Sequence, residues 1–286
     1  MFDIQDLPDE LVLKILSYSE PKVLISCGQV SKRIRRISLD GTLWMIANLE
    51  KKIVKAEFLE MILGKGCRIL NLCHSTILGC LSSNIKSQLS VLYFSQPECK
   101  CNENDGCNCD ENTGILEELL SSCCLLQHLV LENIFLTSKM AVSICKNGKT
   151  LQTLNLNRSF LEGCTNDNLN GTLANKILLE MFKCCQELKE VDLSYIADNQ
   201  GLKDEGLEFL AKTISPNLEK LNLSSSLVMD DHLKILLSRC NKITALTIGA
   251  IWITDDSFSL SNIRQQLNLT FEGEYPQHPL ILRRNM

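Results

Sequence analysis

A cysteine-rich stretch at residues 97–114 is the part of the sequence whose residue types and spacing most directly suggest chemistry. Four thiolates suit a tetrahedral zinc ion, and a bound metal would offset the entropy that the loop loses when it becomes ordered. The spacing differs from the usual Cys-x2–4-Cys zinc pattern, and the stretch is acidic with few apolar residues, which is typical of disorder. Two interpretations stay open: a solvated insertion without metal, and a zinc site at Cys99, Cys101, Cys107 and Cys109.

The rest of the sequence shows no residue pattern for catalysis. Its histidines are scattered, and their spacing to carboxylates fits neither a metal site nor a catalytic triad: they are His74, His128, His232 and His278. A glycine-rich loop that would cradle phosphates is also missing from the sequence. The sequence therefore predicts a non-catalytic protein without a cofactor.

Composition and charge exclude several environments and partners. The formal net charge of -5 at pH 7 argues against nucleic acid or an anionic membrane as the main partner. The acidic N-terminus has no apolar core that would make it a secretory signal, and no stretch approaches the roughly 20 apolar residues of a membrane span. We therefore expect a protein of the nucleus and/or cytoplasm, whose 15 cysteines are reduced and in many cases buried as small apolar groups.

An internal repeat defines the elements that would position a binding surface. An apolar residue followed by x-x-L-x-L recurs, with its middle apolar position at Leu70, Leu92, Leu129, Leu154, Val191, Leu221, Leu246 and Leu267. The shorter steps between these positions match the leucine-rich repeat period of roughly 20–29 residues. The L-x-L alternation predicts strands with one buried face, each paired with its neighbour in a parallel sheet. Apolar residues at helical spacing predict return helices over residues 115–120, 175–182, 205–210 and 231–237.

Other features of the repeat region refine this prediction. Cys123, Cys185 and Cys240 each fall three residues before the leading apolar residue of the next strand, which indicates a small side chain packed at the helix-to-strand turn. The two longest steps contain the cysteine-rich insertion and a polar, turn-rich loop at residues 163–173. We predict an α/β fold in which residues 51–286 form a curved leucine-rich-repeat solenoid, with parallel strands on its concave face and helices on its convex face.

Residues 1–50 lack the repeat and predict three short helices. Pro8 suits the first turn of a helix, where Asp9 and Glu10 complement the helix dipole. Helices this short bury too little surface to be very stable alone, so a partner should cover their exposed apolar residues. The basic cluster at residues 32–36 is most simply the solvent-facing side of a helix, and a phosphate or nuclear-import contact is the alternative.

Several motifs in this segment together resemble an F-box: Leu7-Pro8-x-Glu10-Leu11, Ile15-Leu16, Leu24, Val30-x-Lys32-Arg33 and Leu43-Trp44. With its repeats, the chain resembles F-box/leucine-rich-repeat proteins, most closely those of the S-phase kinase-associated type. The resemblance implies a subunit that docks on the adaptor of an SCF ubiquitin ligase, and through it on the cullin and RING subunits. The repeats would bind a protein substrate, in phosphorylated or unmodified form, with or without an accessory recognition subunit. Ile34 and Ser19 depart from the family pattern, which has Trp and an apolar residue there.

The resemblance also assigns candidate site residues. Those that would pack the F-box or face the adaptor are Leu7, Pro8, Glu10, Leu11, Ile15, Leu24, Val30 and Trp44, the last of which would seal the box against the first repeat. Substrate contacts are expected on the concave strand face and the loops after it, at Tyr93, Glu132, Asn155, Asn157, Asp192, Asn222 and Trp252. The alternative is a leucine-rich-repeat binding or inhibitor protein outside the ligase, with a vestigial F-box.

Overall fold

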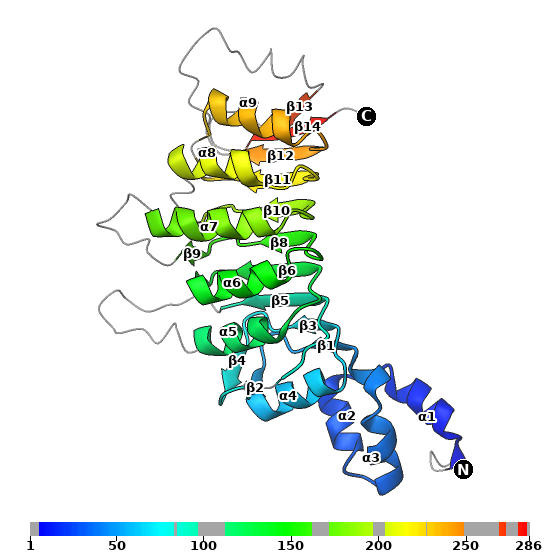
Figure 1. Ribbon diagram of the computed structural model, residues 1–286. Helices are drawn as coiled ribbons and strands as arrows, with labels where there is room; N and C mark the ends of the chain where they lie inside the picture. Colours follow the sequence, from blue (N-terminus) through cyan, green and yellow to red (C-terminus); the bar gives the residue numbers. More distant parts are fainter. Residues whose placement is uncertain are drawn as a thin grey trace.

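The computed structural model describes residues 6–82, 85–96, 112–161, 172–196, 204–226, 228–248, 269–272 and 280–284. Three short helices come first, as predicted: α1 (Asp9–Leu16), α2 (Pro21–Cys27) and α3 (Lys32–Ser38). A 3-10 turn over Gly41–Trp44 then leads into the sheet. Figure 1 shows these helices as a group at one end of the molecule, below the first strands. The chain is thus a mixed α/β protein with a helical N-terminal region and a large, mainly parallel sheet.

Ten strands form the large sheet, in the order β1-β3-β5-β6-β8-β10-β11-β12-β14-β13. The parallel strands are β1 (Ile46–Asn48), β3 (Ile69–Asn71), β5 (Val91–Ser95), β6 (His128–Glu132), β8 (Thr153–Asn155), β10 (Glu190–Asp192), β11 (Lys220–Leu223) and β12 (Ala245–Ile248). Their middle residues are buried and stand side by side in register: Ala47, Leu70, Leu92, Leu129, Leu154, Val191, Leu221 and Leu246. The sequence predicted all of these strands except β1.

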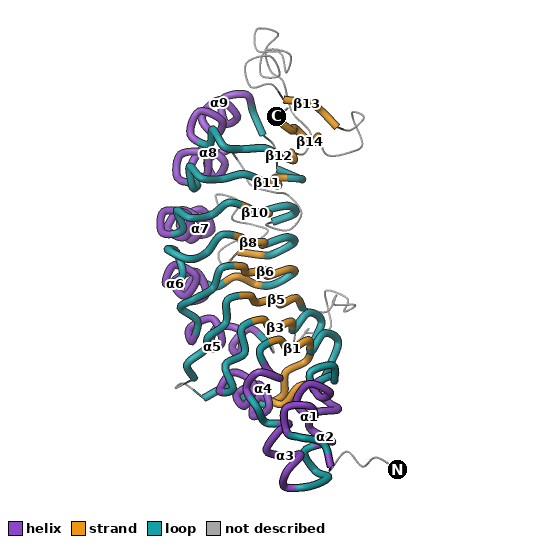
Figure 2. The backbone as a smooth tube through the Cα atoms, turned by 90° about the vertical axis from the view of Figure 1, so that its right-hand side faces the viewer, coloured by secondary structure: helices purple, strands orange, loops and turns teal. Residues whose placement is uncertain are grey.

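Helices cover one side of the sheet, and no described helix lies on the other side, which we call the open strand face (Figures 1 and 2). The middle residues of the strands are buried beneath the helices. The helices are α4 (Ala56–Gly64), α5 (Thr113–Ser122), α6 (Ser138–Lys146), α7 (Thr172–Cys184), α8 (Asp204–Thr213) and α9 (Asp230–Arg239). The predicted helices correspond to α5, α7, α8 and α9, whereas α4 and α6 were not predicted. Two small parallel sheets, β2 (Ile53–Lys55) with β4 (Thr76–Leu78) and β7 (Phe135–Leu136) with β9 (Phe160–Leu161), flank the large one.

The structure corrects the boundaries of both predicted loops. Thr113 and Gly114 belong to α5 and Thr172 begins α7, so neither the 97–114 nor the 163–173 segment extends as far as predicted. Asn112 is buried: its Oδ1 accepts from the Ile77 amide, and its Nδ2 donates to the Ser75 carbonyl, each at 3.3 Å. The residues at the start of α5 and α7 are polar, so the sequence pattern did not indicate where either helix begins.

The end of the sheet differs from the prediction in direction. The strand expected around Leu267 is β13 (Leu269–Glu272), which pairs antiparallel with β14 (Leu280–Arg284). β14 in turn pairs antiparallel with β12, so the last parallel repeat was predicted wrongly. The reason is physical, because alternation of apolar residues marks a strand with one buried face and carries no information about strand direction.

Buried cysteines lie at the helix-to-strand turns, as predicted. Cys123, Cys185 and Cys240 are at most 1% exposed. Burial raises the pKa of these thiols to about 11, 12 and 11 respectively, and that of Cys67, in a similar position, to about 11. Thiols with so high a pKa stay protonated and react poorly, so these cysteines serve packing.

Two adjacent cysteine pairs allow a direct test of this role. Cys124 and Cys184 are exposed, whereas their neighbours Cys123 and Cys185 are buried. Iodoacetamide at about pH 8 is expected to alkylate Cys124 and Cys184 in the native protein and to leave their neighbours unmodified, because only accessible thiolates react. Peptide mass spectrometry gives the ratio of alkylation between the two cysteines of each pair. The same reaction in urea should modify all four cysteines. Equal native labelling within either pair would contradict the structure.

Candidate functional site

Asp9 at the start of α1 holds the first and third helices together. Its carboxylate accepts from Arg33 Nε at 2.8 Å and also pairs with Arg36. Arg33 further donates to the carbonyl of Leu7. These guanidinium groups, Arg33 first, lower the pKa of Asp9 below its usual value. Lys32, Arg35 and Arg36 of the basic cluster are exposed, as expected for the solvent-facing side of a helix, whereas Arg33 is half-buried.

The predicted F-box residues divide into an interior group and a surface group. Leu24 and Trp44 are each only 1% exposed. The Trp44 ring packs edge-on against Phe58 of α4, with 5.9 Å between ring centroids, and its Nε1 donates to the Ser38 carbonyl at 2.9 Å. Trp44 thus connects α3 to the first helix of the sheet region, where a seal was expected. Ile34 is also buried, so it fills interior space at the position where the family pattern has Trp.

The surface group consists of apolar residues that are exposed on the first two helices and on the turns after them. Leu11, Ile15 and Tyr18 follow one another at helical spacing on α1 and the turn after it, and all are exposed. Val30, in the turn between α2 and α3, is 74% exposed. Val23 and Ile25 of α2 are exposed as well. We call these six residues the apolar face; Tyr18, Val23 and Ile25 were not predicted.

The remaining predicted residues frame this face. Pro8 and Glu10 are exposed, and Leu7 is half-buried against the core. Pro8 is the N-cap of α1, one residue earlier than predicted, while Pro21 is the first residue of α2. The periodicity of α1 could have identified Tyr18, which lies seven residues after Leu11.

The open strand face brings several predicted substrate residues together. Asn155, Asp192 and Asn222 stand side by side on β8, β10 and β11. Asn155 Nδ2 donates to Glu132 at 3.0 Å, and Asn222 Nδ2 donates to Asp192 at 3.0 Å. Tyr93 lies on the same face of β5, and Asn157 follows β8. Side chains that the prediction missed here are Glu190 and Lys220, which form an ion pair at 2.6 Å.

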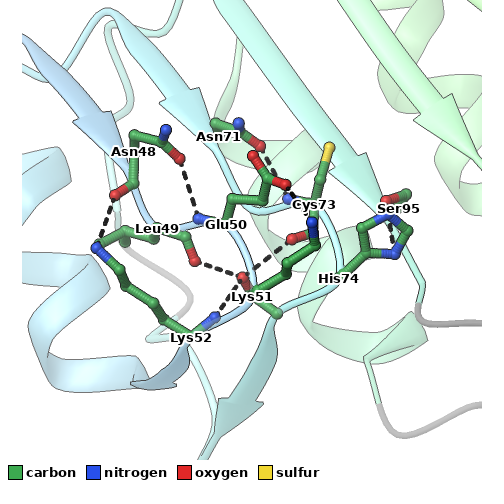
Figure 3. A network of polar contacts seen from close by, with 10 residues as sticks. Asn48, Leu49, Glu50, Lys51, Lys52, Asn71, Cys73, His74 and Ser95 are labelled. Carbon is green, nitrogen blue, oxygen red and sulfur yellow. Dashed lines mark hydrogen bonds and ion pairs between the residues drawn. The ribbon is translucent and has the colours of Figure 1, made fainter.

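The polar residues of this face also have a structural role in a recurring turn. Asn71 Oδ1 accepts from the Cys73 amide at 2.9 Å, and Asn48 accepts from the Glu50 amide at 3.1 Å (Figure 3). Asn155, Asp192 and Asn222 make the same bond to the amide two residues ahead. A non-glycine residue has a positive φ three positions after each of six aligned strand residues, Asn48, Asn71, Val130, Asn155, Asp192 and Asn222. These residues of positive φ are Lys51, His74, Asn133, Arg158, Tyr195 and Ser225.

Asn222 illustrates what this turn contributes to stability. Its Oδ1 accepts from the Ser224 amide and hydroxyl, and its half-buried amide group bonds Asp192. Asn222→Ala is expected to lower the free energy of unfolding by about 1–3 kcal/mol, because these partners lose their hydrogen bonds. Urea unfolding followed by circular dichroism measures the change. Lys242→Ala, at an exposed position, is the control with an expected change within about 0.5 kcal/mol, and an equally small change at Asn222 would disprove the role.

Some predicted residues lie outside the described part of the chain, namely Trp252 and the four cysteines of the possible zinc site. Among the residues that the structure does describe, His, Cys, Asp and Glu form no cluster suited to a metal ion. No helix within the same described ranges is both long and apolar enough to span a membrane.

Comparison with known families assigns the N-terminal helices. The match covers residues 4–47, which include α1 to α3, Trp44 and the whole apolar face. The family model that they match is described as F-box-like, and the N-terminal region of this chain is therefore an F-box-like domain.

Proposed function

We propose that this chain is the substrate-recognition subunit of an SCF ubiquitin ligase. The observation that carries the proposal is the F-box-like domain at residues 4–47. At the family level, such domains bind the SCF adaptor, and their proteins are generally non-catalytic substrate receptors. The apolar face of α1 and α2 supports this role, since exposed apolar patches commonly mark protein interfaces. Leu11, Ile15 and Val30 are the residues that we propose contact the adaptor.

We further propose that residues 51–286 are a leucine-rich-repeat domain of the S-phase kinase-associated type. The in-register parallel strands with buried leucines, and the helices that return on the other side, support a curved solenoid with a concave strand face. The substrate would bind this face at Tyr93, Glu132, Asn155, Asn157, Asp192 and Asn222. Nuclear and/or cytoplasmic location and an accessory recognition subunit are part of the same proposal.

The contribution of such a receptor is proximity. A substrate held on the strand face gains a high effective concentration relative to the ubiquitin-conjugating enzyme recruited at the other end of the complex. The receptor then needs no acid, base or nucleophile of its own.

Affinity purification of the tagged full chain from cells tests the proposal. Recovery of the SCF adaptor together with the cullin and RING subunits is the expected result. Recovery of none of these subunits would overturn the ligase role and favour a leucine-rich-repeat binding or inhibitor protein with a vestigial F-box.

A further inference from the structure

The open strand face is hollowed where it meets the N-terminal helices, and exposed apolar side chains line part of this hollow. A depression of about 580 Å³ lies at this junction. Its apolar lining is Leu43, Met45, Ile46 and Ile69, and its polar lining is Ser17, Ser19, Thr42, Arg68 and Ser90. Ile46 is 65% exposed on β1, at the edge of the sheet. The apolar character continues along the face through residues that pair in register, namely Val91 beside Ile69 and Val130 beside Tyr93.

Further along the same face, a second hollow has a different chemistry. It measures about 320 Å³ and lies over β8, β10, β11 and β12, with Asn155, Glu190, Asp192, Lys220 and Asn222 in its lining. Lys220 is already engaged by Glu190 at 2.6 Å, so this pair is neutral.

Two carboxylates on this part of the face have only uncharged partners. Asp192 accepts from the Ser194 amide and hydroxyl and from Asn222 Nδ2. Glu132, at the border between the two halves, accepts from Asn155 Nδ2. Within the ranges that the structure describes, neither has a lysine or arginine partner. Among the side chains that the structure describes, the face therefore presents an end with exposed apolar residues and an end where Asp192 and Glu132 carry negative charge without a cationic partner.

The distance between the hollows sets the length of segment that could occupy both. The first hollow reaches the sheet at β1 and β3, and the second lies around β10. Four strand-to-strand steps separate β3 from β10. At about 4.8 Å for each step, the separation is about 19 Å. An extended chain covers this distance with about six residues, at roughly 3.3 Å per residue.

We propose that this face binds an extended protein segment that places an apolar side chain in the junction hollow and, about six residues away, a lysine or arginine beside Asp192. The inference deepens the proposed function, on which it rests only in taking the bound segment to be the substrate. Charge complementarity favours a basic side chain at the second hollow, because a like charge against Asp192 and Glu132 would be repelled. A phosphorylated residue is therefore expected elsewhere than in this hollow.

Fluorescence anisotropy with labelled peptides and the full chain tests the proposal. The probe carries two leucines and two arginines separated by a Gly/Ser spacer of about five residues. Matched peptides replace the arginines by glutamates or phosphoserines, or shorten the spacer to about two residues. The arginine peptide is expected to bind with a Kd below about 1 mM, and the three others at least about tenfold more weakly.

Variants of the chain test whether the open strand face is the surface that binds the peptide. Glu132→Gln combined with Asp192→Asn removes both charges and keeps the acceptors for Asn155 and the Ser194 amide; asparagine already makes the same turn at Asn222. The expected loss of affinity for the arginine peptide is about tenfold. Ile46→Ser should weaken the same peptide through its leucine end. The control neutralises two exposed carboxylates of the helical side, Glu57→Gln with Glu205→Gln, and should bind as the unmodified chain does.

Each remaining outcome overturns the proposal. These outcomes are no saturable binding of the arginine peptide below about 1 mM, equal or tighter binding of the glutamate or phosphoserine peptide, and unchanged binding by the double variant. Adaptor capture is measured on the same preparations. A chain that binds the peptide and captures no adaptor would refute the ligase role alone, whereas capture without peptide binding would refute this inference alone.

Discussion

Leu11→Glu is expected to reduce capture of the SCF adaptor by about 100-fold or more, because a charge buried in an apolar interface without a partner costs several kcal/mol. Leu11 is 51% exposed and lies between Pro8 and Ile15 on the predicted docking side of α1. In the free chain the new carboxylate can point into solvent. Folding should therefore be preserved while binding is lost.

A matched control separates this loss from a general effect of an added charge. Val142 on α6 is also an exposed apolar residue, at 62%, and it lies on the helical side of the sheet. Val142→Glu should capture the adaptor as the unmodified chain does. Val30→Glu provides a second variant on the apolar face and should behave like Leu11→Glu. Adaptor recovery is quantified by immunoblot, with circular dichroism to verify folding, and full recovery by both face variants would rule out this docking surface.

The sequence predicted part of this face because α1 is long enough to show a helical period. Leu11 and Ile15 are four residues apart, which places both on one side, and both are exposed. In the seven-residue α2, Leu24 is buried although the adjacent Val23 is exposed. A run of consecutive apolar residues does not distinguish the two sides of so short a helix. Only packing against α3 determined which side chain faced inward.

The sheet was more predictable because each parallel strand repeats the same buried positions. Leucine or valine at the middle of β3 to β12 identified those strands, whereas β1 has Ala47 there and was missed. Ala47 nevertheless pairs with Leu70 in register. β1 therefore forms because it pairs with β3, even though its own composition is a weak signal for a strand.

The polar residues of the open face were predicted as substrate contacts, and their position on that face is what the strand alternation implied. The alternation could not reveal that Asn155, Asp192 and Asn222 also cap turns, since the same side chain at a strand end serves both purposes. It also could not reveal that Lys220 pairs with Glu190 and that no described lysine or arginine pairs with Asp192, because that depends on which strands are neighbours.

Trp44→Ala is expected to have the largest effect on stability, lowering the free energy of unfolding by about 3–5 kcal/mol. The indole is fully enclosed between the N-terminal helices and α4, where it packs on Phe58. Its removal leaves a cavity at the only aromatic contact described between the F-box-like domain and the sheet region. It also leaves the Ser38 carbonyl without its indole partner.

A conservative variant divides this loss into packing and hydrogen bonding. Trp44→Phe keeps an aromatic ring against Phe58 and loses the hydrogen bond from Nε1 to the Ser38 carbonyl. Its free energy of unfolding should fall by about 1–3 kcal/mol, largely because this carbonyl is left without its partner. Tyr18→Ala removes an aromatic side chain that is 80% exposed and should change stability by no more than about 0.5 kcal/mol. Urea unfolding followed by circular dichroism ranks the three variants by their free energy of unfolding. Trp44→Ala as stable as Tyr18→Ala would show that the stability of the chain does not depend on this residue.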